Sequence, residues 1–149
     1  MKPLYLDTGL VLKLLVEEPL SPVVRTYLAK QRAPVWFTKI VSLEVENTLQ
    51  AMRHRRQLTP TQLRQTQALL AQLCNEGKFC QTTLTLDAIS DEMLRLTSTI
   101  TSRTGCRTLD LLHIAAARLL PSPVFVSTDK RQLAAAKLAG LSTVNLSPP

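Results

Sequence analysis

Two short apolar segments, one near each end of the 149-residue chain, run directly into an aspartate. Residues 4–6 precede Asp7, and residues 124–128 precede Asp129. Both segments have the composition of buried strands. In an open α/β sheet, ligands bind outside the carboxyl ends of the strands. The two aspartates are therefore candidates for one shared site, although each alone could be no more than a helix N-cap.

A third acid lies on a helix face that should be apolar. Asp110 belongs to a segment that predicts a helix over residues 108–120, and its neighbours at i+4 and i+7 are Ile114 and Ala117. As a first-turn acid, Asp110 could simply favour the helix dipole. Burial of an unpaired carboxylate costs several kcal/mol, however, and a metal ion would offset that cost.

Glu44 is the fourth acid of interest. In the helix expected over residues 40–56, Glu44 falls inside the continuous apolar arc of the helical wheel, whereas Glu46 falls outside it. We therefore expect Glu46 to be a solvated surface charge. Glu44 could be a rim residue whose carboxylate reaches water, or a member of the same site as Asp110.

Four carboxylates gathered in one place would require a cation. Neighbouring carboxylates cannot all ionise unless a positive charge neutralises them. Ligation by oxygen alone favours Mg²⁺ or Mn²⁺. Such an ion activates water and stabilises the charge that develops on a phosphate, and the net charge of +7 favours a polyanionic partner. These observations predict hydrolysis of phosphodiester bonds.

The elements that position these residues alternate along the chain. Strands are expected at residues 4–6, 35–38, 79–84, 124–127 and 143–146. Helices are expected at 10–16, 22–31, 40–56, 60–77, 108–120 and 130–139, and another begins at Thr85 or Asp87 and is closed by Gly105. This order predicts an α/β fold with a mainly parallel sheet covered by helices on both faces.

Length and composition limit the remaining possibilities. Residues 1–149 fit one domain, and 45% hydrophobic with 19% charged residues is typical of a globular protein. No apolar run is long enough to span a bilayer, and the start has no signal-peptide core, so a cytoplasmic location is expected. Three cysteines without paired spacing favour reduced thiols over a zinc site.

Four segments resemble motifs of a known family. Residues 5–8, 42–45, 107–117 and 126–130 are similar to those of PIN-domain ribonucleases, most closely the VapC-like toxins of toxin–antitoxin pairs. The resemblance implies a three-layer α/β/α fold and cleavage of single-stranded RNA with Mg²⁺ or Mn²⁺. It also implies a homodimer and a cognate antitoxin. The implied catalytic and metal-binding residues are Asp7, Glu44, Asp110 and Asp129.

Residues beside the four acids could assist them. Thr8 and Thr128 are plausible donors that orient the carboxylates. The cations that flank the acids in sequence, and are candidates to hold RNA, are Arg103, Arg107, Lys130 and Arg131. His113 lies three residues after Asp110, but a histidine among leucines and alanines is expected to be a packed core residue.

Two departures from the family pattern and two rival functions remain. Gly9 stands where many relatives carry a small polar residue, and Asp129 is the only acid of its loop, so the number of bound metal ions, one or two, stays open.

A phosphatase of the haloacid-dehalogenase type needs a second aspartate two residues after the first, where this chain has Gly9. A catalytically inactive PIN-like module that binds RNA or protein stays open as the alternative.

Overall fold

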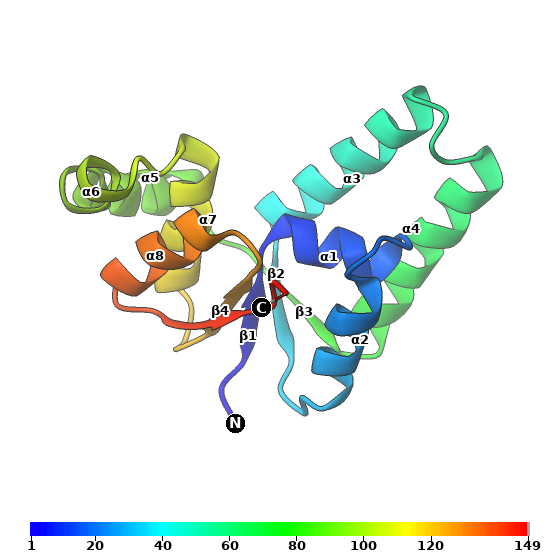
Figure 1. The fold of residues 1–149 in the computed structure, drawn as a ribbon, viewed down its shortest axis with the longest axis horizontal. Coiled ribbons are helices and arrows are strands. Elements are labelled where there is room, and N and C mark those ends of the chain that lie inside the picture. The colour runs from blue at the N-terminus through cyan, green and yellow to red at the C-terminus, as the bar shows by residue number, and fades with distance from the viewer. Residues whose placement is uncertain (149) are drawn as a thin grey trace.

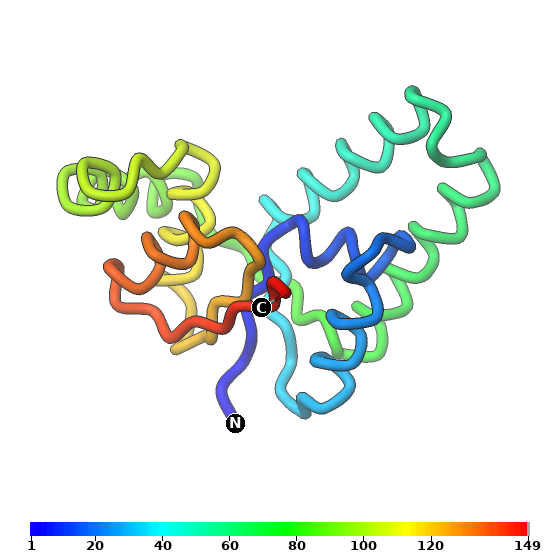
Figure 2. The backbone as a smooth tube through the Cα atoms, in the orientation of Figure 1, coloured from blue at the N-terminus to red at the C-terminus, as the bar shows by residue number. Residues whose placement is uncertain are grey.

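A single parallel sheet forms the centre of the protein, seen in a computed structural model that describes residues 1–148 (Figures 1 and 2). The strand order is β3-β2-β1-β4-β5, and each neighbouring pair is parallel. The strands are β1 (Leu4–Leu6), β2 (Val35–Thr38), β3 (Phe79–Thr82), β4 (Val124–Ser127) and β5 (Ser142–Asn145). All five expected strands are therefore present, and the expected parallel arrangement is confirmed.

Helices cover both faces of this sheet. In Figure 1, α1 to α4 lie to the right of the strands and α5 to α8 to the left, which confirms the three-layer α/β/α fold. The first group is α1 (Thr8–Leu15), α2 (Ser21–Ala29), α3 (Lys39–His54) and α4 (Pro60–Asn75). The second group is α5 (Leu86–Leu96), α6 (Ser102–Thr104), α7 (Thr108–Arg118) and α8 (Lys130–Leu138), with a π-helix η1 (Thr97–Thr101) between α5 and α6.

Side-chain caps fix where several helices begin. The Asp7 and Asp129 carboxylates accept hydrogen bonds from backbone N–H groups of the first turns of α1 and α8. Thr38 caps α3 in the same way, and Thr59 and Gln62 form a capping box at α4. The two aspartates thus serve as N-caps, and this role leaves open whether they also do chemistry.

The helix expected between Thr85 and Gly105 is not a single regular helix. It is α5, followed by the π-helix η1 and the short α6. Gly105 ends it with a φ of 63°, a left-handed conformation that glycine adopts without steric cost. A π-turn inserts an extra residue, which apolar periodicity does not reveal.

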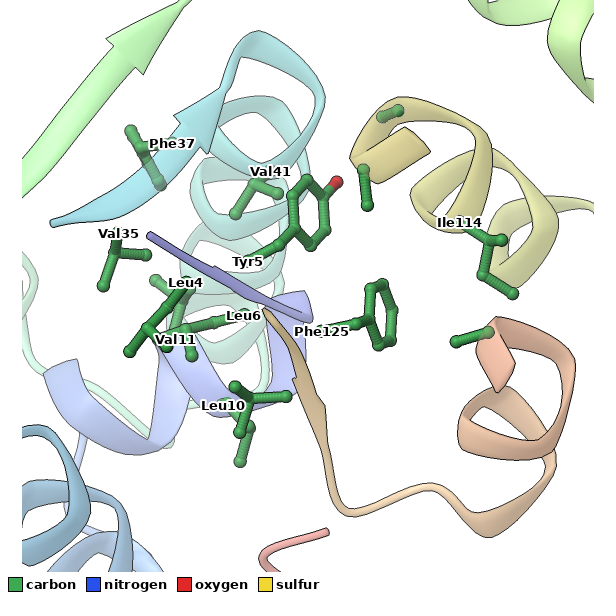
Figure 3. Close-up of a cluster of buried hydrophobic side chains, with 14 of the residues drawn as sticks. Leu4, Tyr5, Leu6, Leu10, Val11, Val35, Phe37, Val41, Ile114 and Phe125 are labelled. Carbon is green, nitrogen blue, oxygen red and sulfur yellow. The ribbon is translucent and has the colours of Figure 1, made fainter. Parts of the chain in front are cut away.

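The core is centred on the two middle strands. Tyr5 of β1 and Phe125 of β4 are fully buried, and their rings stack with centroids 5.5 Å apart (Figure 3). Val41 of α3 packs on one side of this pair and Ile114 of α7 lies on the other, as Figure 3 shows. One connected cluster of apolar side chains joins both helical layers. It supports the prediction of one domain, which stays a prediction.

Glu46 differs from its expected place. It is half-buried, and its carboxylate accepts hydrogen bonds from Gln67 of α4 at 2.9 and 3.2 Å. The wheel separates Glu46 from the apolar arc correctly, but it does not show that α4 packs beside α3. Glu46 is therefore a link between two helices.

The structure also shows the apolar character of the helices and the state of the cysteines. None of the helices among residues 1–148 combines the length and apolar character needed to cross a lipid bilayer. The cysteines, Cys74, Cys80 and Cys106, are free thiols.

An ion cluster around the buried Glu92 joins three helices, and its two arginines reach the surface. Glu92 of α5 is 6% exposed; one of its oxygens accepts a hydrogen bond from Arg118 of α7 and the other from Arg95 at 2.7 Å. Arg118 also donates to the carbonyl oxygen of Ala139, directly after α8. The hydrogen bond from Arg118 lowers the pKa of Glu92. The cluster therefore holds the layer formed by α5, α7 and α8 together.

Substitution Glu92→Gln should lower the free energy of unfolding at pH 7 by about 1–3 kcal/mol, the range for hydrogen bonds to charged groups. The pKa of Glu92 in the folded protein lies below its ordinary value of 4.5. The stabilisation from the ionised carboxylate is therefore complete above the ordinary value, and it is lost as the pH falls through the pKa of the folded protein. Urea denaturation at pH 7 and at about pH 3 should show the difference between wild type and variant shrinking in acid. Asp91→Asn, at an exposed neighbour, is the matched control. Equal stabilities of Glu92→Gln and wild type at pH 7 would contradict the assignment.

Candidate active site

The pairing of β1 with β4 brings the two strand-end aspartates to the same edge of the sheet. Leu6 pairs with Val126, and the Asp7 N–H donates to the Val126 carbonyl oxygen at 3.2 Å. The two strands therefore end together. Asp7 follows one of them and Asp129 follows the other by two residues, at the edge where the sequence predicts a site.

One cavity at this edge takes in all four predicted acids. Its volume is about 540 Å³. The residues that line it are Asp7, Thr8, Gly9, Glu44, Arg107, Thr108, Leu109, Asp110, His113, Thr128, Asp129 and Gln132. Helices α1, α3 and α7 contribute to this lining together with the loop after β4. Residues separated by more than 120 positions in the sequence thus share one cavity.

Asp7 is the most buried of the four acids, with 9% of its surface exposed. Oδ1 accepts the Leu10 N–H at 2.8 Å, and Oδ2 accepts a hydrogen bond from the hydroxyl of Ser127, the last residue of β4. Burial raises the pKa of Asp7, and the hydrogen bonds from Ser127 and Leu10 oppose that rise. A Cβ at Gly9 would lie 3.4 Å from Asp7 Oδ1, so the glycine leaves that side of the carboxylate uncovered.

Glu44 meets two donors on one oxygen. Its Oε2 accepts a hydrogen bond from the Thr8 hydroxyl and lies 2.8 Å from Nε2 of His113. The hydrogen bond with His113 is the largest cause of a lowered pKa for Glu44. The Thr8 hydroxyl therefore helps to hold the Glu44 carboxylate in position.

His113 is buried, as expected, but it is not only a packing residue. It is 4% exposed and lines the cavity, where it contacts Glu44. Its other ring nitrogen, Nδ1, lies 2.9 Å from the hydroxyl of Tyr5. The spacing of three residues from Asp110, which places His113 on the same helix face, is the sequence feature that could have revealed this role.

Asp110 has a cationic neighbour in the preceding loop. Arg107 Nε lies 3.1 Å from Asp110 Oδ2, with the arginine side chain 73% exposed and the aspartate side chain 15% exposed.

Burial raises the pKa of the neighbouring Cys106 thiol to about 11, and the Asp110 and Asp129 carboxylates add to the rise. The thiol beside the cavity is therefore protonated at neutral pH and is a poor nucleophile.

The loop after β4 uses a different hydroxyl from the one expected. Among residues 1–148, the Thr128 hydroxyl has no hydrogen bond to a carboxylate, although Thr128 lines the cavity. Ser127 instead donates to Asp7 and accepts the Asp129 N–H at 2.9 Å. Side chains alternate along a strand, so Ser127, in line with Phe125, points inward. Asp129 Oδ1 accepts the N–H groups of Arg131 and Gln132 at 2.8 and 3.1 Å.

Three of the four predicted RNA-binding cations border the acids. A second cavity, of about 410 Å³, is lined by Arg107, Asp110, Asp129, Lys130 and Arg131. It shares Arg107 and both aspartates with the first. Arg103 is exposed on α6 and lines neither cavity, so the structure does not bring it to the acids.

The donor set has the chemistry of a hard-cation site. Four carboxylates line one cavity, and oxygen ligands suit Mg²⁺ or Mn²⁺. Within residues 1–148, the oxygens Glu44 Oε1, Asp110 Oδ1 and Asp129 Oδ2 have no hydrogen-bond partner and remain available as ligands. No group of three or more acidic, histidine or cysteine side chains in this part of the chain is already placed to hold an ion, so binding would require side-chain adjustment.

Comparison with known proteins agrees with the fold. The family model for the PIN domain matches residues 4–138. The crystal structure of FitAcB from Neisseria gonorrhoeae is similar, with a TM-score of 0.67, 14% sequence identity, and coverage of 96% of this chain and 97% of that chain. No curated protein matches the chain by sequence.

The three-layer fold places Asp7 and Asp129 at the carboxyl ends of adjacent parallel strands. The chain belongs to the PIN-domain family, since the family model spans most of its length. The resemblance drawn from the sequence is thereby confirmed. PIN domains are generally nucleases that use divalent metals, so membership supports a hydrolase.

Substitution Ser127→Ala should lower the free energy of unfolding by about 1–3 kcal/mol, because the buried Asp7 Oδ2 and the Asp129 N–H would both lose their partner. The pKa of Asp7 should rise further, since the hydrogen bond that opposes the effect of burial is removed. Urea denaturation and carboxyl ¹³C NMR titration measure the two quantities. Thr128→Ala is the control and should leave the Asp7 pKa unchanged; an equal shift in both variants would contradict the role of Ser127.

Proposed function

We propose that the protein is a metal-dependent endoribonuclease that cleaves single-stranded RNA. The observation that carries the proposal is the convergence of Asp7, Glu44, Asp110 and Asp129 on one cavity of a chain whose net charge is +7. An acidic cavity in a basic protein suits a cation and a polyanion together. Membership of a family of nucleases supports the same reaction.

The residues divide into two tasks. Asp7, Glu44, Asp110 and Asp129 would hold Mg²⁺ or Mn²⁺. Such an ion supplies a water of lowered pKa and neutralises the charge that develops on the scissile phosphate. Arg107, Lys130 and Arg131, at the border of the acids, would hold the RNA backbone. Thr8 and Ser127 keep Glu44 and Asp7 in place through their hydroxyl groups.

The biological setting belongs to the same proposal. The resemblance to VapC-like toxins and the shared fold with FitAcB support a toxin that acts in the cytoplasm, forms a homodimer and is inhibited by a cognate antitoxin. Growth arrest on expression, relieved by co-expression of the product of a neighbouring gene, would support this setting.

Substitution Asp110→Asn should reduce Mg²⁺-dependent cleavage of single-stranded RNA about 100-fold or more, the size of effect expected when a group that stabilises transition-state charge is removed. Asp7→Asn should do the same, and because asparagine also serves as an N-cap, α1 should remain capped. Cleavage of a fluorescent oligoribonucleotide measures the rate, and circular dichroism verifies the fold.

Asp91→Asn, on the exposed face of α5, is the control and should cleave at the wild-type rate. Undiminished cleavage by Asp110→Asn would refute the assigned site. Wild-type protein that binds RNA without cleaving it in Mg²⁺ or Mn²⁺ would favour the alternative of an inactive binding module.

The cations that border the acids should contribute more to RNA binding than Arg103 does. In the non-cleaving Asp110→Asn background, Arg131→Gln or Lys130→Gln should reduce the slope of log K against log salt by about 0.7, the value per phosphate contact on a single strand. Arg103→Gln, which lies outside both cavities, should change the slope by less than half as much. Fluorescence anisotropy over a salt series measures these slopes. A larger change of slope for Arg103→Gln would contradict the proposed RNA contacts and would indicate that RNA binds beside α6.

A further inference from the structure

A hydrogen-bonded series of polar side chains, Tyr5–His113–Glu44, leads from the core to the cavity; it is called the Tyr5–His113–Glu44 chain below. The Tyr5 hydroxyl lies 2.9 Å from His113 Nδ1, and His113 Nε2 lies 2.8 Å from Glu44 Oε2. Tyr5 is fully buried and His113 is 4% exposed. Neither residue is one of the four acids, yet together they connect strand β1, helix α7 and helix α3.

The donors and acceptors of this chain can be assigned. A carboxylate only accepts hydrogen bonds, so His113 Nε2 must carry a proton to interact favourably with Glu44. In a neutral imidazole, Nδ1 is then an acceptor, and its partner must donate. The Tyr5 hydroxyl can donate this hydrogen bond. The sequence of donors runs from Tyr5 to His113 to Glu44.

Tyr5, the first residue of the Tyr5–His113–Glu44 chain, is held in place by its neighbours. The Tyr5 ring stacks on Phe125 with an interplanar angle of 11° and meets the His113 ring edge-on at a centroid distance of 6.0 Å. Both contacts hold the phenol ring in place and therefore fix the position of its hydroxyl oxygen. Figure 3 shows the Tyr5 and Phe125 rings side by side in the core, and the Tyr5 hydroxyl links this packing to His113.

We propose that Tyr5 and His113 are positioning residues, which fix Glu44 so that it presents Oε1 to the metal ion. Oε2 is occupied by His113 and by the hydroxyl of Thr8, whereas Oε1 has no hydrogen-bond partner among residues 1–148. Hydrogen-bonded partners behind a metal ligand typically account for 10- to 100-fold in metal affinity. This inference rests on the proposed function, because it assumes that Glu44 is a ligand.

The first test is the tautomer of His113, which requires neither metal nor RNA. The chain has two histidines, and the exposed His54 serves as an internal reference in ¹⁵N NMR of histidine-labelled protein. We expect His113 to carry a proton on Nε2, the nitrogen that faces Glu44. In Tyr5→Phe, loss of the donor to Nδ1 should give a mixture of tautomers. An Nε2 without a proton in the wild type would overturn the proposal.

The second test is Mn²⁺ affinity, measured by calorimetry with the metal alone. His113→Leu, which keeps an apolar side chain but has no donor, should weaken binding at least about 10-fold. His113→Gln, whose amide N–H can reach Glu44, should recover part of the loss. Tyr5→Phe should weaken binding about 2- to 10-fold, the range for one hydrogen bond. His54→Leu is the matched control and should bind as the wild type does.

The outcomes separate this inference from the proposed function. Equal Mn²⁺ affinity of His113→Leu and wild type would overturn the positioning role, as would equal losses in His113→Leu and His113→Gln. Wild-type protein that binds no Mn²⁺ would overturn both proposals. A wild type that binds Mn²⁺ through this chain of residues but does not cleave RNA would overturn the proposed function alone.

Discussion

The site depends above all on the parallel pairing of β1 with β4. Because Leu6 pairs with Val126, the two strands end at the same level, and the Asp7 N–H bonds directly to the neighbouring strand. Helices α1 and α8 then begin at Asp7 and Asp129. Two acids that are 122 positions apart thus border one cavity only because the central strands are adjacent and in this register.

The way in which each buried acid is compensated distinguishes structure from function. Glu92 has an arginine on each oxygen, and its charge is neutralised within the fold. Among residues 1–148, neither Asp7 nor Glu44 forms an ion pair with an arginine or a lysine. Their donors are hydroxyl groups, a backbone N–H and the His113 ring, and of the cavity acids it is Asp110 that pairs with an arginine, Arg107. Hydroxyl and backbone N–H donors hold a carboxylate in position but leave its charge in place. That uncompensated charge is available to a cation, which is why the cavity, and not the Glu92 cluster, is the candidate site.

The sequence predicts the fold class and the four acids, because both follow from short-range patterns. Strand-end aspartates and helix faces are visible within about ten residues, and the alternation of elements indicates the parallel sheet. The roles of Ser127 and Tyr5 are not visible in this way, because their partners lie 120 and 108 positions away. Only the three-dimensional pairing of strands creates these contacts. The π-helix escapes prediction because its extra residue leaves no regular period.

An acidic cavity poses a problem for a nuclease, because its carboxylates repel the phosphates that it must bind. The protein resolves this by placing cations at the border and by keeping its acids few elsewhere, with 18 basic against 11 acidic residues in all. Arg107 lies on this border, in contact with Asp110 and shared by both cavities. A phosphate that approaches from the side of Lys130 and Arg131 would meet positive charge first and the carboxylates last. Under the proposed function, the order of charges along this path, more than the net charge, would allow one small surface to accept both a metal ion and a polyanion.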